Sequence, residues 1–261
     1  MCCKKFVLLI AILAFLFSLL AAQETQKRPE VLVPENANEA RLNRLQPPDQ
    51  VMDVIGVKPG MTVAEIGAGK GRYVVQLAVR VGESGKVYAE DINAKFLKHL
   101  EKRCQRGGLK NIEIILGDVT DPKLPEGELD LIFVISAYHH FADPVALLRN
   151  ARSALKPNGV LAIGEWLPWD DGDLECSTPE QMEAQMKEAG YQLERIETFL
   201  KKNNMYIYIF RLDDTKLSHK DLLEAFGVKP QGIGSPDLTT GTRISIFDIF
   251  AQIVEFDLLW V

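Results

Sequence analysis

Cysteine is scarce in this sequence, and its cysteines form no recognisable ligand or redox pair. Of the four, Cys2 and Cys3 stand at the start of the chain, while Cys104 and Cys176 are isolated from each other. Because a C-x-x-C pair is missing, zinc ribbons, thioredoxin-like sites and dense disulfide frameworks are excluded. We expect Cys104 and Cys176 to be free thiols, and we expect no metal.

A surplus of basic side chains is also missing. The 261 residues carry 30 Lys and Arg against 36 Asp and Glu, which gives a net charge of −6. Proteins that bind nucleic acids usually present a basic face, so nucleic acid is not an expected partner. Apolar residues, in contrast, are abundant. With 47% apolar and 25% charged residues, the composition is that of a globular protein with a sizeable core.

Long uncharged runs are absent except at the N-terminus. Residues 6–22 carry no charge, follow Lys4 and Lys5, and end in two alanines. This is the pattern of a secretory signal peptide, and the run is close in length to a membrane-spanning helix. We therefore expect residues 1–22 either to export the chain, to a periplasmic or secreted location, or to anchor it. If the segment is not cleaved, residues 6–22 contact the membrane.

The rest of the chain alternates strand and helix patterns. Apolar runs predict strands, with apolar residues at helical spacing between them; one such helix, 94–106, places Phe96, Leu97 and Leu100 on its apolar face. Two closing strand patterns are joined so closely that they predict an antiparallel hairpin. This order predicts an α/β fold with a mostly parallel sheet and helices on both faces. The predicted strands are 62–66, 86–90, 112–116, 129–135, 160–164, 192–199 and 205–212.

Together with residues 1–22, these patterns divide the chain into four regions. Residues 23–47 are expected to be a polar linker and a short helix, and residues 48–212 the alternating domain. Residues 213–261 form an extension to which the sequence assigns no role. Within the domain, a helix is expected at 144–155, ended by the Lys-Pro-Asn-Gly turn before strand 160–164.

The stretch Val63–Tyr73 is the centre of the domain. An apolar strand ends near Glu65, and glycines at 67, 69 and 71 then lead into a helix. Glycine lets a backbone bend sharply and approach a ligand closely, which predicts a nucleotide-type cradle. The G-x-G-x-x-G fingerprint of nicotinamide dehydrogenases is missing, because the third glycine comes one residue early and Arg72 occupies its place.

Polar side chains follow the predicted strands at Glu65, Asp91, Asp118, Ser136 and Glu165. Ligands of open parallel sheets bind at the carboxyl ends of the strands. There, the Asp91 carboxylate can accept hydrogen bonds from ribose hydroxyls, and Asp118 from the exocyclic amine of adenine. Glu65 is expected to face a ligand ammonium. Such an acidic lining suits a ligand with a positive charge and no phosphates.

Five segments resemble the successive motifs of class I S-adenosylmethionine-dependent methyltransferases. They are VAEIGAGKG (63–71), KVYAEDI (86–92), LGDV (116–119), LDLIFV (129–134) and LKPNGVL (155–161). The resemblance covers about residues 48–212. It implies a Rossmann-like, seven-stranded, mostly parallel sheet with a C-terminal antiparallel hairpin. It also implies transfer of a methyl group from S-adenosyl-L-methionine to an acceptor, expected to be a small molecule.

The resemblance assigns roles to particular residues. It places the glycine loop beside the methionine portion of the methyl donor, Asp91 on the ribose, and Asp118 with Val119 around the adenine. Glu90 is the neighbouring alternative for the ribose contact. The predicted cofactor-binding residues are Glu65, Gly67, Ala68, Gly69, Gly71, Asp91, Ile92, Asp118, Val119 and Ser136.

The acceptor side is expected after the fourth strand. Tyr138, His139 and His140 are candidate catalytic residues, because a histidine with a pKa near neutrality can act as a general base. The alternative is that a histidine only packs beneath the following helix. The Asn/Asp-Pro-Pro-Tyr pattern of enzymes that methylate amino groups of nucleic-acid bases is missing, which argues against base methylation.

A second function is compatible with the same residues. S-adenosylmethionine is made in the cytosol, whereas residues 1–22 predict export. The alternative to an enzyme is therefore a non-catalytic protein that binds an adenosyl ligand and retains the methyltransferase fold. The complete set of predicted cofactor residues favours the enzyme.

Overall fold

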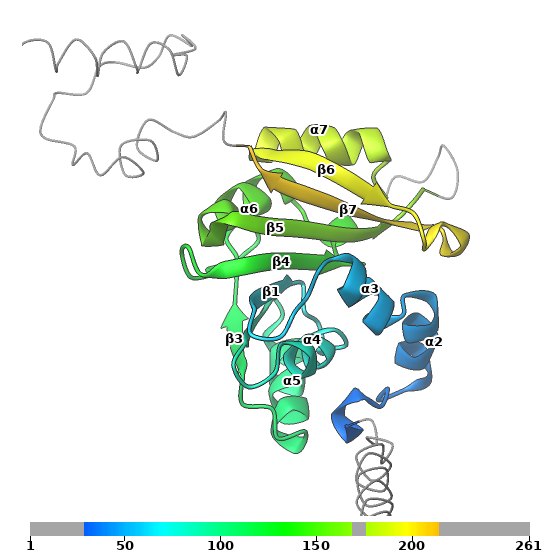
Figure 1. Cartoon of the computed structure of the whole chain (residues 1–261), viewed down its shortest axis with the longest axis vertical. Helices are drawn as coiled ribbons and strands as arrows, with labels where there is room; N and C mark the ends of the chain where they lie inside the picture. Colours follow the sequence, from blue (N-terminus) through cyan, green and yellow to red (C-terminus); the bar gives the residue numbers. More distant parts are fainter. Residues whose placement is uncertain (1–28, 169–175, 214–261) are drawn as a thin grey trace, which may run out of the picture. The chain divides into compact units, whose positions relative to one another are not determined.

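The computed structural model describes residues 29–168 and 176–213 (Figure 1). The predicted targeting segment and the extension beyond residue 213 lie outside the described residues. Within the described part of the chain, no helix is long and apolar enough to cross a membrane.

Seven strands form one sheet in the order β3-β2-β1-β4-β5-β7-β6. Pairs from β3 through β5 are parallel, whereas β7 is antiparallel to both β5 and β6. This confirms the predicted Rossmann-like α/β fold with its C-terminal antiparallel hairpin. The strands are β1 (Thr62–Ile66), β2 (Lys86–Asp91), β3 (Ile112–Leu116), β4 (Leu129–Ile135), β5 (Leu155–Trp166), β6 (Tyr191–Glu197) and β7 (Met205–Leu212).

Helices cover both faces of the sheet (Figure 1). One face packs under α3, α4 and α5, around core residues such as Leu77 and Phe133. The other packs under α6 and α7, around Ile132 and Leu148. Because Ile132 and Phe133 point to opposite buried faces, β4 is apolar except for Asp130. The helices are α2 (Ala37–Leu45), α3 (Pro48–Val54), α4 (Val74–Val81), α5 (Ala94–Arg106), α6 (Pro144–Ala151) and α7 (Pro179–Ala189).

Side-chain caps begin the helices that follow the site loops. The Asn93 side chain accepts hydrogen bonds from the first backbone N–H groups of α5. Thr178 and Gln181 form a reciprocal capping box at the start of α7. These caps satisfy donors that have no partner within the helix, which fixes where each loop ends.

The boundary between α6 and β5 differs from the prediction. The helix expected to reach residue 155 ends at Ala151 and is followed by a 3₁₀ turn, η3 (Arg152–Ala154). Strand β5 then begins at Leu155 and includes the Pro-Asn-Gly segment that we expected to be a turn. Leu155 pairs with Leu129 and Val160 with Leu131, and residues 156–159 between them have no pairing partner in β4, so this segment is an irregularity between two paired positions.

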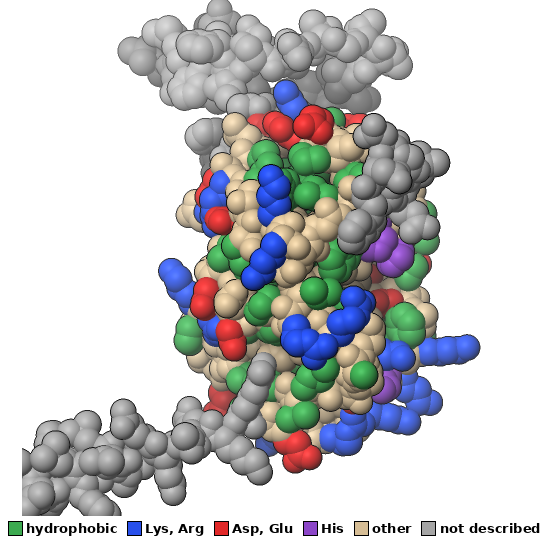
Figure 2. Space-filling model, turned by 90° about the vertical axis from the view of Figure 1, so that its right-hand side faces the viewer, with side chains coloured by type: hydrophobic (Ala, Val, Ile, Leu, Met, Phe, Trp, Pro, Cys, Tyr) green, Lys and Arg blue, Asp and Glu red, His purple; other side chains and the backbone are tan. Residues whose placement is uncertain are grey.

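The described part of residues 23–47 packs on the domain, and the short helix predicted there is α2. A short 3₁₀ turn, η1 (Glu30–Leu32), buries Leu32. In α2, Glu39 accepts two hydrogen bonds from Arg103 of α5, at 2.7 and 3.2 Å. Both side chains are almost fully buried. Figure 2 views the side of the molecule that carries α2 and α3, where basic side chains are interspersed with acidic and apolar ones.

Candidate functional site

The candidate site lies where the strand order reverses. From β1 the chain proceeds outward through β2 to β3, and it then returns to add β4 and β5 on the other side of β1. The crevice at such a reversal, at the carboxyl ends of the strands, is where open α/β sheets bind ligands. A cavity of about 410 Å³ occupies this position, between Gly67 and Gly69 of the β1 loop, Asp91 of β2 and Ser136 of β4.

The three glycines of the loop have different structural roles. A Cβ on Gly67 would lie 2.7 Å from the Cβ of Ala137, and one on Gly71 would lie 2.2 Å from Leu100, so both permit close packing. A Cβ on Gly69 would meet nothing within 4 Å. Gly69 lines the cavity. At this position the missing Cβ therefore leaves room for a ligand rather than for the protein itself.

Asp91 is fixed at the edge of the cavity by the loop. Its Oδ2 accepts the backbone N–H of Gly69 at 2.8 Å, and its Oδ1 accepts that of Asn93 at 2.7 Å. Hydrogen bonds to a carboxylate are stronger than those between neutral groups. The orientation of Asp91 is therefore set before any ligand arrives, which suits an acceptor for ligand hydroxyls.

Glu90 also lines the cavity, although it points to the other side of β2. Its side chain is almost fully buried, and Oε2 accepts only a long hydrogen bond of 3.4 Å from Gly67. Among the described residues, Oε1 has no partner. Burial raises the pKa of Glu90 to about 8. A protonated Glu90 can donate a hydrogen bond, so near pH 7 it presents a neutral carboxyl group beside the fixed carboxylate of Asp91.

Contrary to our expectation, Glu65 does not line the cavity. It is buried behind the loop, burial raises its pKa to about 8, and the nearby Arg72 opposes that rise. The Val74 backbone at the start of α4 also lowers this pKa, to a smaller extent. Ala68 and Gly71 likewise do not line the cavity. The predicted cofactor residues that do line it are Gly67, Gly69, Asp91, Ile92, Asp118, Val119 and Ser136.

Apolar side chains are exposed at the mouth of the cavity. Ile92, Phe96 and Val119 are 60%, 39% and 50% exposed, although large apolar residues are usually buried. Together they form a surface suited to a flat aromatic ring. Asp118 lies beside them, with its carboxylate 2.7 Å from Lys123 Nζ. The sequence missed Phe96, because its helical spacing with neighbouring leucines predicts a core position.

The N-terminal segment contacts the cavity-lining Ser136 through Gln46. This fully buried side chain donates to Ser136 Oγ at 2.7 Å and accepts a short hydrogen bond from Arg72. Ser136 has a φ of +51°, an uncommon value for a residue other than glycine. Such local strain is often found at ligand sites. No sequence pattern predicted that Gln46 contributes to this site.

The three candidate catalytic residues point in different directions. They form a 3₁₀ turn, η2 (Tyr138–His140). Of the three, only His140 lines the cavity. Tyr138 is buried in the core and donates its hydroxyl to Gln185 at 2.8 Å, so the expectation that it acts on the acceptor is not supported. His139 Nδ1 lies 2.8 Å from Oε1 of the buried Glu165.

One further group of potential ligands lies beside this turn. His139, Glu165 and Cys176 bring a nitrogen, an oxygen and a sulfur atom within 4.8 Å of one another. The sequence predicted no metal, because the three residues lie far apart along the chain.

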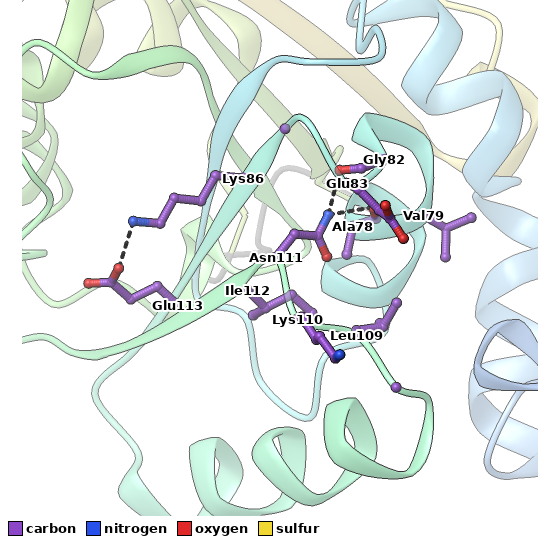
Figure 3. Close-up of a pocket in the computed structure, with 12 residues that line it drawn as sticks. Ala78, Val79, Gly82, Glu83, Lys86, Leu109, Lys110, Asn111, Ile112 and Glu113 are labelled. Carbon is purple, nitrogen blue, oxygen red and sulfur yellow. Dashed lines mark hydrogen bonds and ion pairs between the residues drawn. The ribbon is translucent and has the colours of Figure 1, made fainter.

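A larger cavity, of about 940 Å³, lies at the opposite end of the sheet (Figure 3). It is lined by the first residues of β2 and β3 and by the end of α4. Its Asn111 amide donates to the carbonyls of Ala78 and Gly82, both at 2.9 Å, and so terminates α4. Lys86 and Glu113 pair with each other at 2.7 Å. Asn111, Lys86 and Glu113 are thus engaged in structural contacts, at the strand ends opposite to those where such sheets bind ligands.

Comparison with known proteins agrees with this geometry. A family model described as "Methyltransferase domain" matches residues 57–215. The crystal structure of a SAM-dependent methyltransferase from Aquifex aeolicus is 27% identical in sequence. It aligns with a TM-score of 0.61 over 67% of this chain and 96% of that one.

Two curated relatives are similar over part of their length. The ubiquinone/menaquinone biosynthesis C-methyltransferase UbiE of Shewanella sp. (strain ANA-3) is 30% identical over 116 residues, which are 44% of this chain and 46% of the relative. The nocamycin O-methyltransferase of Saccharothrix syringae is 26% identical over 114 residues, 44% of this chain and 41% of the relative. The chain therefore spans less than half the length of these two relatives.

Proposed function

The chain belongs to the methyltransferase-domain family whose model matches residues 57–215, and on this basis we propose that it transfers a methyl group from S-adenosyl-L-methionine to a small-molecule acceptor. The observation that carries the proposal is the cavity at the strand reversal. A rigidly held carboxylate, a glycine loop with open space and exposed apolar side chains meet there. When bound, S-adenosylmethionine supplies a methyl group on a positively charged sulfur.

The described residues fit the parts of this methyl donor. Asp91 would accept hydrogen bonds from the ribose hydroxyls. Ile92, Phe96 and Val119 would contact the faces of the adenine, with Asp118 accepting from its amine. The buried Oε1 of Glu90 has no partner among the described residues and would gain one from a ligand in the cavity. The described residues thus offer partners for both the ribose and the adenine of the donor.

The amino-acid end of the donor would lie against the glycine loop. The group of Gln46, Ser136 and Arg72 stands beside the reversal point, and its polar atoms come from three segments far apart in the sequence. Arg72 contributes a guanidinium group, whose planar donors suit a carboxylate. This group would orient the donor, and orientation is the main demand that methyl transfer places on the protein.

His140 is the residue best placed to act on the acceptor. It lines the cavity, whereas His139 is held by Glu165 and Tyr138 faces the core. A neutral imidazole would remove a proton from an acceptor hydroxyl or amine during transfer. A small acceptor suits a cavity of about 410 Å³. The names of the two curated relatives also refer to small molecules.

We also propose that residues 1–22 export or anchor the chain, from their charged start and uncharged run. The mass of the mature N-terminus and fractionation with a tag at Val261 test this. Retention of the full N-terminus in a membrane fraction would indicate an anchor, and its loss a signal peptide. A cytosolic, uncleaved protein would contradict both forms of the proposal.

Calorimetry with S-adenosylmethionine and S-adenosylhomocysteine tests the cofactor. The purified protein should bind both. Asp91→Asn should weaken binding about 10–100-fold, because hydrogen bonds to a charged acceptor contribute about 1.5–3 kcal/mol. The control Glu113→Gln, at the opposite end of the sheet, should not change the affinity. If Asp91→Asn has no effect and Glu90→Gln does, the ribose contact belongs to Glu90.

A screen of small-molecule extracts with isotopically labelled methyl donor then separates the two functions. Methyl incorporation that falls in His140→Ala supports the enzyme and its catalytic residue. Binding of the donor without incorporation into any extract supports the non-catalytic alternative, and absence of binding would overturn both.

A further inference from the structure

We propose that His139, Glu165 and Cys176 form a binding site for a single Zn²⁺ ion beside the cavity. One potential ligand atom from each side chain lies within 4.8 Å of the other two. The three come from separate parts of the fold. His139 lies in η2 after β4, Glu165 near the end of β5, and Cys176 two residues before Thr178, which caps α7.

The first argument is the burial of Glu165, which is 1% exposed. It accepts hydrogen bonds from the Trp166 backbone at 2.7 Å and from the His139 backbone at 3.2 Å, in addition to the ring contact. Among the described ion pairs its only partner is His139. His139 supplies positive charge only when it is protonated, and no Lys or Arg of the described residues pairs with this buried carboxylate, so a further source of positive charge would stabilise it. A divalent cation would supply it.

The second argument is the donor set. Imidazole nitrogen, carboxylate oxygen and thiolate sulfur are the three protein ligand types of Zn²⁺, at roughly 2.0–2.3 Å from the metal. Around a tetrahedral ion, ligands at these lengths lie roughly 3.2–3.8 Å apart. The His139 nitrogen and the Glu165 oxygen, 2.8 Å apart in a direct hydrogen bond, would separate slightly to admit the ion. Small side-chain rotations would bring all three into range, and binding would release the thiol proton to solvent.

The position of the site suggests what the ion does. The His139 ring centroid lies 3.9 Å from that of His140, which lines the cavity. The metal would therefore fix η2, β5 and the segment before α7 together, directly behind the acceptor side of the cavity. Three protein ligands leave a fourth tetrahedral position for water or another ligand.

Metal analysis of the full-length protein tests the proposal without any activity measurement. Protein stripped with a chelator and then dialysed with Zn²⁺ should retain one ion per chain. Substitution with Co²⁺ should give a thiolate-to-metal charge-transfer absorption in the near ultraviolet. Cys176→Ser should abolish this absorption and weaken Zn²⁺ binding more than about 100-fold, since loss of even an indirect partner of a metal ligand costs 10–100-fold.

Cys104, the other cysteine among the described residues, provides a matched control. Cys104→Ser changes the buried thiol on α5 and should leave both the absorption and the stoichiometry unchanged. His139→Ala should weaken Zn²⁺ binding as Cys176→Ser does, and circular dichroism should show that each variant folds. The proposal is overturned if the wild-type protein retains no metal, or if Cys176→Ser retains as much as Cys104→Ser. Binding of S-adenosylmethionine does not enter these measurements.

Discussion

Replacing Glu90 by glutamine should change how the stability of the protein depends on pH. Burial raises the pKa of this carboxyl from 4.5 to about 8 in the folded state. A carboxyl with a raised folded pKa favours folding when it is protonated. Its charged form therefore lowers the free energy of unfolding. This loss is absent below about pH 4.5, grows as the pH rises, and is complete above about pH 8.

The size of the effect follows from the shift. The full pKa shift corresponds to a loss of about 5 kcal/mol in the free energy of unfolding. About 2 kcal/mol of this loss falls between pH 6 and pH 8. Glutamine has nearly the same shape but no charge to bury. Glu90→Gln should therefore stabilise the protein at pH 8 and reduce the loss of stability between pH 6 and pH 8 by about 2 kcal/mol.

Urea unfolding at several pH values measures this directly. The free energy of unfolding of wild-type, Glu90→Gln and the control Glu126→Gln would be compared at pH 6, 7 and 8. Glu126 is an exposed side chain in the loop before β4, so its replacement should leave the pH dependence as in the wild type. Equal slopes for Glu90→Gln and the wild type would refute the reasoning that a buried, poorly partnered acid costs stability at this site.

Three further changes test other contacts. Arg103→Met should lower the free energy of unfolding by about 3–5 kcal/mol, because it leaves the buried Glu39 carboxylate unpaired, and a loss below 1 kcal/mol would show that the pair is solvated. Gly71→Ala should cost about 2–4 kcal/mol in urea unfolding, since its φ is +85° and a Cβ would clash with Leu100; an unchanged midpoint would contradict that packing. Tyr138→Phe should cost about 1 kcal/mol of stability while calorimetry shows unchanged S-adenosylmethionine affinity, and a weaker affinity would place its hydroxyl at the cavity after all.

Much of the fold could be predicted because its central strands are buried on both faces. The run 129–135 is apolar except for Asp130, and its observed bounds are the predicted ones. The β5 boundary was wrong for a local reason. Lys-Pro-Asn-Gly is typical of a turn and has no pairing partner in β4, but Leu155 before it pairs with Leu129, which extends β5 across the segment. Contacts between distant segments override local preference there.

The candidate site was predicted as far as strand ends and glycines determine it. Adjacent residues of a 3₁₀ turn point about 120° apart, which explains the three directions of Tyr138, His139 and His140. A sequence cannot show which of them faces the cavity. The contribution of Gln46 could not be predicted either, because it depends on how the N-terminal segment folds back to Ser136, 90 residues further along the chain.

The two outer strands of the sheet, β3 and β6, have a consequence for association between copies. An outer strand offers unpaired backbone groups to any other chain, and charged side chains discourage such pairing. On β3, Glu113 is half exposed in its pair with Lys86. On β6, Glu194, Arg195 and Glu197 form a partly exposed charged row. The β6 border is thereby protected against strand-to-strand aggregation, whereas β3, with one charged residue and the exposed Leu116, is the border more open to pairing with a second molecule.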